Sequence, residues 1–169
     1  LESGDFDCVM LSPPCGTWSR ANWANDDGPK PCRNRRHPWG IAHQRAAAQR
    51  RADSGNEFIH FSIRAILSAQ TANRKGFRVR CVLEHPEDLG RMHRGEPASI
   101  WQLPELRLAF GESPYATVAG HQCQFPGVDR KKPTRLFSDI LEIVVEPTIE
   151  FDSPIHTAHV WISLFPISF

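Results

Sequence analysis

Two short segments of this chain carry side chains that could do covalent chemistry. The segment Ser12–Cys15 (Ser-Pro-Pro-Cys) follows the apolar run Asp7–Leu11, and Glu84-His85-Pro86 closes a second run at Arg78–Glu84. Both runs have the pattern of buried strands that prolines terminate. In open α/β sheets, reactive groups gather beyond the carboxyl ends of the strands. If the two strands are neighbours, Cys15 and Glu84 emerge at one edge of the sheet.

A thiol and a carboxyl group placed in this way suit the activation of a cytosine ring. Carbon 5 of cytosine is a poor nucleophile, but addition of a thiolate to carbon 6 turns the ring into an enamine. Cysteine supplies such a thiolate and later leaves readily. A carboxyl group at ring nitrogen 3 stabilises the charge that develops during the attack. The base must also be flipped out of a duplex before a protein group can reach it.

A third pair of segments completes a pattern. His121–Gly127 is followed by Lys132–Ser138, which begins Lys-Pro-Thr-Arg. Taken with the Pro-Pro-Cys loop and the Glu-x-Pro element, these segments resemble the DNA (cytosine-5) methyltransferase family, especially its phage-type members. The family usually has Asn where His85 stands.

The resemblance implies a partial Rossmann-like methyltransferase fold of the α/β class, with a mostly parallel sheet and a C-terminal β segment. It implies S-adenosyl-L-methionine as methyl donor and DNA, or RNA, as partner. By the same resemblance, Cys15 is the nucleophile and Glu84 its carboxyl partner. The resemblance also implies substrate-binding residues, which are Pro14, Ser19, Arg20, Lys132, Thr134 and Arg135. Ser12 and Pro13 are expected to face the cofactor, and no metal site is expected.

The cofactor strand of the family, with its Gly-rich turn, should precede the nucleophile strand. Only six residues precede Asp7. We therefore expect a catalytic-loop half that is incomplete or inactive alone. Two alternatives stay open: a non-catalytic nucleic-acid-binding remnant in a mobile-element protein, and an amino-methyltransferase acting on adenine or cytosine. Enzymes of the latter kind place an aromatic residue where Cys15 stands.

Basic residues cluster although the net charge is only +1. The stretch Gly28–Ala52 contains no Asp or Glu, and a second group lies at 130–135. Such stretches suit phosphate contact, although a solvated face is an equally good interpretation. The basic residues are Lys30, Arg33, Arg35, Arg36, Arg45, Arg50 and Arg51 in the first group, and Arg130, Lys131, Lys132 and Arg135 in the second.

The remaining periodicities predict the elements that would position the site. The proline-free stretch from Ile41 to about Lys75 predicts a helix that ends near Gly76 and that Gly55 can divide. Ser99–Phe110 predicts a helix that restarts at Pro104. Thr117–Gln122 and Thr134–Ser138 read as a strand pair, and Ile140–Val145 as a further strand. This order favours residues 1–150 as one α/β domain and leaves 151–169 as a tail of undetermined order.

Other residues are assigned to packing. Cys8 and Cys81 are expected in the core, as are Trp39, Trp101 and the Phe residues, whereas Trp18 and Trp23 can either stack on bases or anchor a loop. The five scattered cysteines match no standard zinc site and indicate reduced thiols.

We find no membrane span or signal peptide in the sequence. We therefore expect an intracellular protein that is not secreted and that can be nuclear. The sequence does not define its oligomeric state.

Overall fold

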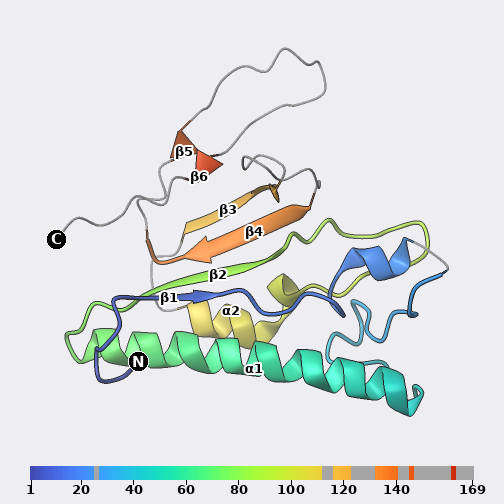
Figure 1. The fold of residues 1–169 in the computed structure, drawn as a ribbon, viewed down its shortest axis with the longest axis horizontal. Coiled ribbons are helices and arrows are strands. Elements are labelled where there is room, and N and C mark those ends of the chain that lie inside the picture. Colours follow the sequence, from blue (N-terminus) through green and yellow to red (C-terminus); the bar gives the residue numbers. More distant parts are fainter. Residues whose placement is uncertain (25–26, 112–115, 123–131, 141–144, 147–160, 163–169) are drawn as a thin grey trace.

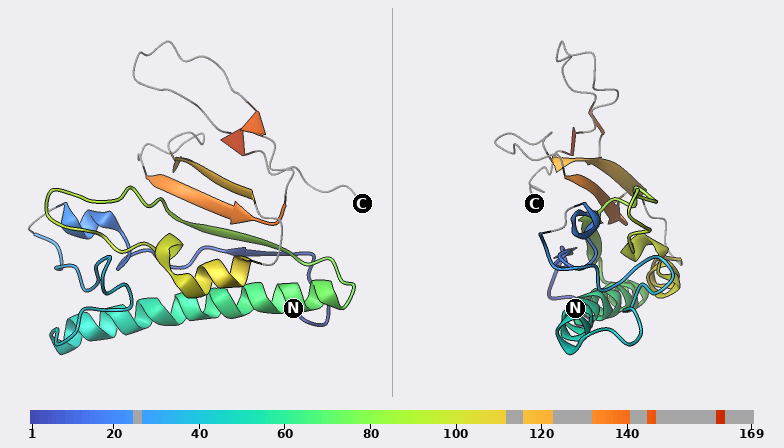
Figure 2. Two further views of the ribbon diagram at one scale, coloured as in Figure 1. Left: turned by 180° about the vertical axis from the view of Figure 1, so that it is seen from behind. Right: turned by 90° about the vertical axis from the view of Figure 1, so that its right-hand side faces the viewer.

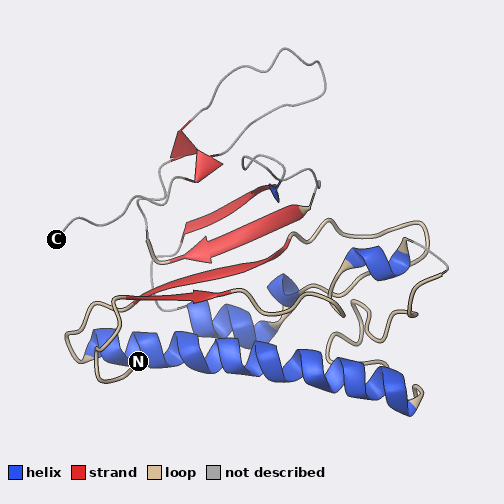
Figure 3. Cartoon of the chain, in the orientation of Figure 1, coloured by secondary structure: helices blue, strands red, loops and turns tan. Residues whose placement is uncertain are grey.

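The computed structural model describes residues 1–24, 27–111, 116–122, 132–140, 145–146 and 161–162. They form an α/β fold in which two helices lie along one side of a four-stranded sheet (Figures 1 and 2). In chain order the principal elements are β1 (Cys8–Leu11), α1 (Ala46–Arg74), β2 (Arg80–Pro86), α2 (Pro104–Phe110), β3 (Ala116–His121) and β4 (Pro133–Ser138). Short 3₁₀ helices η1 (Arg20–Trp23) and η2 (Ile100–Gln102) complete the site region (Figure 3).

The sheet is mixed, in the order β1-β2-β4-β3. Only β1 and β2 pair in parallel, whereas β4 is antiparallel to both β2 and β3. The prediction of a mostly parallel sheet is therefore wrong, although the α/β class is confirmed. The reason lies in the β3–β4 pair, which inserts the reversed strand β4 beside β2. As a result β3 runs in the same direction as β1 and β2 without touching them.

Helix α1 connects the two parallel strands, as a crossover must. It spans 29 residues without a break at Gly55. The predicted stop is confirmed: Gly76 has φ +94° and follows the cap residue Lys75. The Asn73 side chain then bonds both backbone groups of Val79, with N–H···Oδ1 2.7 Å and Nδ2–H···O 2.9 Å. This pair of bonds ties the end of α1 to the start of β2.

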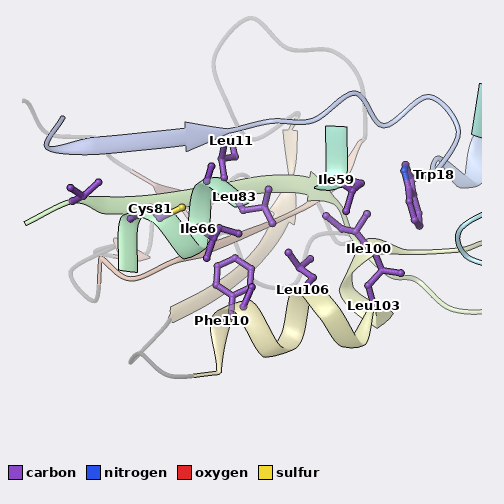
Figure 4. Close-up of a cluster of buried hydrophobic side chains, with 14 of the residues drawn as sticks. Leu11, Trp18, Ile59, Ile66, Cys81, Leu83, Ile100, Leu103, Leu106 and Phe110 are labelled. Atoms are coloured by element: carbon purple, nitrogen blue, oxygen red, sulfur yellow. The ribbon is translucent and has the colours of Figure 1, made fainter. Parts of the chain in front are cut away.

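The apolar core lies between the sheet and the helices (Figure 4). Leu11 of β1 and Leu83 of β2 meet Ile59 and Ile66 of α1 there, and all four are at most 5% exposed. Burying one such side chain fully contributes roughly 1.5–3 kcal/mol. Leu106 of α2 packs against the same cluster. The core therefore fixes β1 and β2 side by side, and with them the residues that follow each strand.

Several residues expected in the core lie on the surface instead. Cys81 is buried as predicted, but Cys8 is exposed because it lies with Met10 on the outward side of the edge strand β1. Phe110 is buried and Trp39 and Trp101 pack against the core. The phenylalanines that are more than 40% exposed, against expectation, are Phe6, Phe58, Phe61 and Phe77.

The C-terminal region is described only in part. A two-stranded sheet joins β5 (Val145–Glu146) to β6 (Trp161–Ile162). The rest of the predicted strand Ile140–Val145 and most of the tail 151–169 lie outside the described residues. Among the described helices, none is long and apolar enough to cross a membrane.

Candidate functional site

The carboxyl ends of β1 and β2 lie side by side, as the sequence predicts. Leu11 pairs with Leu83 at the last rung of the parallel ladder. The next residues are Ser12 on one strand and Glu84 on the other. The Ser-Pro-Pro-Cys turn and the Glu-His-Pro element are thus brought together although about seventy residues separate them in sequence.

Glu84 is held by three donors from three parts of the chain. The Ser12 hydroxyl donates to Oε2 at 2.5 Å, while Gln122 Nε2 and Lys132 Nζ each lie 3.4 Å from Oε1. The carboxylate side chain is 14% exposed, and Lys132 forms its ion pair. Its neighbours on β2 do not bind it: Arg80 donates to the Asp139 carbonyl at 3.2 Å, and the His85 ring has no hydrogen-bond partner among the described residues. Lys132 instead links the Lys-Pro-Thr segment to the Glu84 element.

Cys15 sits in a tight turn beyond β1. Its carbonyl accepts hydrogen bonds from the backbone N–H groups of Trp18 (2.9 Å) and Ser19 (2.8 Å). The Ser19 hydroxyl in turn caps η1 by accepting from Ala21 N at 3.2 Å. Asn22 Nδ2 donates to the Gly16 carbonyl at 2.6 Å. These bonds fix the loop so that the partly buried Cys15 faces a cavity.

The cavity measures about 220 Å³. Its walls come from the Cys15 loop, from the end of β2 and from the start of β4. Charged and polar groups in the wall include Ser19, Arg20, His85, Glu87, Asp88 and Lys132. Glu84 does not line this cavity. Lys132 reaches both places, since it lines the cavity and also contacts Glu84 Oε1.

His85 is the buried histidine in the wall. It is 1% exposed and lies edge-on to Trp18 and Trp101, with both ring centroids 6.4 Å away. Among the described residues, neither of its ring nitrogens has a hydrogen-bond partner. Burial lowers the pKa of His85 to about 3, and the charges of Lys132 and Arg33 act in the same direction against the backbone of Pro86. The ring is therefore neutral at neutral pH and a weak base.

Trp18 anchors the loop rather than offering a stacking face. It is 3% exposed, contacts Trp39 edge-on, and carries the Arg33 guanidinium 3.9 Å above its ring. This decides between the two interpretations of Trp18. Trp23 packs on the 92–95 turn, since a Cβ on Gly95 would lie 2.0 Å from its ring.

Arg33 is a structural residue that sequence reasoning assigned to a phosphate-binding stretch. It is 1% exposed and donates to the carbonyls of Pro38 (2.7 Å) and Ala52 (2.8 Å) and to Asn56 Oδ1 (2.9 Å). Burial lowers its pKa. Nothing in the run Arg33–Arg36 separates it from its exposed neighbours, so only packing identifies it.

The predicted substrate residues of the Lys-Pro-Thr segment lie near the site but have partners of their own. Arg135 makes a bidentate pair with Glu87, both bonds 2.8 Å, and this bonding raises the pKa of Arg135. The Thr134 hydroxyl donates to the Lys132 carbonyl at 3.2 Å.

The other predicted substrate residues lie on two sides of the Cys15 loop. Ser19, Arg20 and Lys132 line the cavity, whereas Pro14 lies on the other side of the loop. Arg130 and Lys131, and Cys123 with its segment, lie outside the described residues.

The residues expected to face the cofactor do not form a site for it. The Ser12 hydroxyl is engaged with Glu84, and Pro13 is buried. The described cysteines Cys8, Cys15, Cys32 and Cys81 are free thiols. Within the described ranges no three His, Cys, Asp or Glu side chains gather as they would around a metal ion.

Comparison of the chain with protein-family models, with curated proteins and with solved structures finds no significant match. The family resemblance therefore rests on the motifs of this chain alone.

Proposed function

We propose that this chain is the base-activating half of a DNA cytosine-5 methyltransferase-like domain with a Rossmann-like architecture. Cys15 is its nucleophile and an unpaired cytosine its substrate. The resemblance makes Glu84 the carboxyl partner; Glu84 lies outside the Cys15 cavity and is linked to its wall through Lys132. Transfer of a methyl group from S-adenosyl-L-methionine would need residues beyond those described above. The chain alone then performs the covalent addition to the ring.

One observation carries the proposal. The three motifs of the resemblance, which stand far apart in the sequence, meet at one end of the sheet: Ser12 bonds Glu84, and Lys132 bonds Glu84 from the other side. The unit β1–α1–β2 supplies two adjacent parallel strands whose carboxyl ends carry these groups. Active groups of α/β proteins gather at such ends.

The chemistry begins with the Cys15 thiolate. It forms a bond to carbon 6 of the ring, and the electrons of the 5,6 double bond move towards nitrogen 3 and carbon 5. A carboxyl group at nitrogen 3 stabilises that charge. Carbon 5 then takes a proton from solvent, loses its original proton, and the sulfur–carbon bond breaks. This cycle returns the thiolate and exchanges the hydrogen on carbon 5.

The two oxygens of Glu84 have different roles in this scheme. Oε2 is fixed by the 2.5 Å bond from Ser12, which orients the carboxylate. Oε1 has the two longer contacts, 3.4 Å from Gln122 Nε2 and from Lys132 Nζ. Because nitrogen 3 of neutral cytosine carries no hydrogen, Glu84 must carry a proton on this oxygen and donate it to nitrogen 3 as the thiolate adds to carbon 6. His85 is too weak a base to deprotonate a thiol, because its pKa lies near 3. Arg20 and Lys132 are the cations in the cavity wall that Cys15 also lines.

The exchange reaction tests the proposal without a methyl donor. The chain is incubated in D₂O with a single-stranded oligodeoxynucleotide that contains cytosine, and NMR follows the loss of the carbon 5 proton. We expect exchange with the natural chain and exchange at the uncatalysed rate with Cys15→Ser. Cys8→Ser is the matched control, since Cys8 is exposed on β1 and does not line the cavity.

Three results decide among the candidate functions. Exchange that survives in Cys15→Ser removes Cys15 from the role of nucleophile. No exchange by the natural chain, together with binding of the oligonucleotide, favours the non-catalytic nucleic-acid-binding remnant. A product methylated on nitrogen in a longer form of the protein would favour the amino-methyltransferase.

A further inference from the structure

The Cys15 loop separates two hollows of different character. Cys15, Trp18 and Ser19 face the cavity described above. Pro14, Gly16 and Thr17 face the opposite way, into an open groove of about 450 Å³ against the first turns of α1. No role was assigned to this groove by the motifs.

The groove is lined by cationic and hydroxyl groups. Arg50, Arg51 and Ser54 come from α1, and Thr17 comes from the loop. Among the described residues no carboxylate lines it: Asp53, on the same helix, accepts from Gln49 Nε2 at 2.7 Å outside the groove.

Arg50 has no partner among the described residues. It is exposed, and among the described residues it makes no hydrogen bond or ion pair. Among the other arginines of the basic stretch, Arg33 is buried, Arg35 lies 3.9 Å from Asp88, and Arg51 donates to the Lys30 carbonyl at 3.4 Å. Arg36 and Arg45 do not line the groove. Within this set, Arg50 is thus the guanidinium best able to meet an anion in the groove.

A buried hydroxyl and the helix end add to the positive character. Thr17 Oγ1 is shielded from solvent and has no hydrogen-bond partner in the described chain, which costs roughly 1–3 kcal/mol unless a ligand or water satisfies it. Helix α1 begins at Ala46 without a side-chain cap and without an acidic residue in its first turn. The partial positive charge of that end is therefore uncompensated.

We propose that this groove binds a backbone phosphodiester of the nucleic-acid strand whose base enters the cavity, with Arg50 and Thr17 as its principal contacts. Arg50 supplies the charge-assisted pair, and the Thr17 hydroxyl, which lies against Gly55 in the free chain, turns outward to donate to a phosphate oxygen. The Cys15 loop then takes part in both base binding and phosphate binding, because some of its residues face the cavity and others face the groove. The identity of the strand rests on the proposed function above, but the binding of phosphate does not require catalysis.

The test is the salt dependence of oligonucleotide binding, measured by fluorescence anisotropy with a short single-stranded oligodeoxynucleotide. Loss of one phosphate contact reduces the slope of log K against log salt by about 0.7 for a single strand. We expect Arg50→Ala to reduce the slope by that amount and the affinity several-fold, and Arg50→Lys to retain most of the slope. Thr17→Val, which keeps the shape, should weaken binding without changing the slope.

Arg64→Ala is the matched control. Arg64 lies on the same helix about 21 Å further along its axis, away from the groove. An unchanged slope in Arg50→Ala, or an equal change in Arg64→Ala, overturns the proposal. So does equal affinity for inorganic phosphate and for the oligonucleotide, because the groove would then bind a small anion rather than a strand.

The two proposals fail separately. Arg50-dependent binding without exchange at carbon 5 leaves the phosphate site in place and removes the catalytic proposal. Exchange that depends on Cys15 but not on Arg50, with the salt slope unchanged in Arg50→Ala, removes the phosphate site alone.

Discussion

Glu84 and His85 are adjacent on β2, yet their surroundings are opposite. Glu84 has three donors within hydrogen-bonding range and keeps some contact with solvent. His85 is buried among Trp18 and Trp101, and neither of its nitrogens is bonded within the described chain. Side chains alternate across a strand, so the two residues face opposite sides of the sheet. One side therefore holds an ionic cluster, and the other holds a neutral imidazole beside the Cys15 cavity.

The difference shows how a site can divide its tasks. The Glu84 side is ordered by charge and hydrogen bonds, which salt and single substitutions weaken only modestly. The His85 side is held together by apolar packing. Burial there accommodates the neutral imidazole ring and disfavours its protonated form. Lys132 is the residue that connects them, since it lines the cavity and contacts Glu84.

The largest effect should come from acid on the His85 side. The unfolded chain takes up a proton on His85 near pH 6.5, whereas the folded chain resists protonation until about pH 3. The stabilisation is therefore fully present above pH 6.5 and is lost as the pH falls through the window between those values. We expect the His85 contribution to lower the free energy of unfolding by about 3 kcal/mol between pH 7 and pH 4.

Urea unfolding of the natural chain and of His85→Phe at both pH values measures this contribution. The phenyl ring fills a similar volume but does not titrate, so the variant should lose about 3 kcal/mol less on acidification. An equal loss of unfolding free energy in both proteins would show that protonation of His85 does not cause the destabilisation by acid.

A smaller effect is expected on the Glu84 side. Glu84→Ala leaves Ser12, Gln122 and Lys132 without their shared acceptor, and we expect a loss of about 1–2 kcal/mol in the free energy of unfolding. Glu84→Gln keeps an acceptor for Ser12 and should cost less, about 0.5 kcal/mol, because the pair with Lys132 is partly exposed. Chemical denaturation at low and high salt distinguishes the ionic part, which salt should reduce. A loss as large as that of a buried core residue would contradict the comparison.

The smallest effect on stability should come from Cys15 itself. Cys15→Ser replaces a partly exposed thiol by a hydroxyl of similar shape, and we expect a change within about 0.5 kcal/mol. Thermal unfolding of the variant provides the measurement. A much larger loss would mean that Cys15 is a packing residue, and the exchange experiment would then no longer isolate its chemistry.

Much of the layout was predictable from local patterns. The run Asp7–Leu11 and the proline after it predict β1 and its end. The proline-free stretch from Ile41 to about Lys75 predicts the helix observed at Ala46–Arg74, in which Ile59 and Ile66 are buried. Pro104 restarts the second helix as expected, with Ile100–Gln102 as a separate turn. The strand pair of β3 and β4 was also predictable. Local propensity and periodicity suffice here because each element carries its own start and stop residues.

Other features could not be predicted from one sequence. The sheet is not mostly parallel, because β4 pairs with β2 in the antiparallel direction. The order and direction of strands depend on which strand pairs with β2, and a local pattern does not specify that partner. Gly55 does not divide α1: a Cβ there would lie 2.6 Å from Thr17 Oγ1 and 2.9 Å from Arg33 Nη2, so the glycine lets the loop approach the helix. These outcomes depend on contacts between residues distant in the chain, which no local window contains.

The sequence by itself determined which groups end the two strands, because prolines stop a strand wherever the ladder would need their missing N–H. It also determined that a long helix joins them. Only the tertiary structure decided that Glu84 is bonded by Ser12 and Lys132, that Cys15 shares its cavity with His85, and that Arg33 is buried while Arg50 is exposed. The physical reason is that strand alternation and packing select the face on which each side chain lies, and both depend on the partners that the fold brings together.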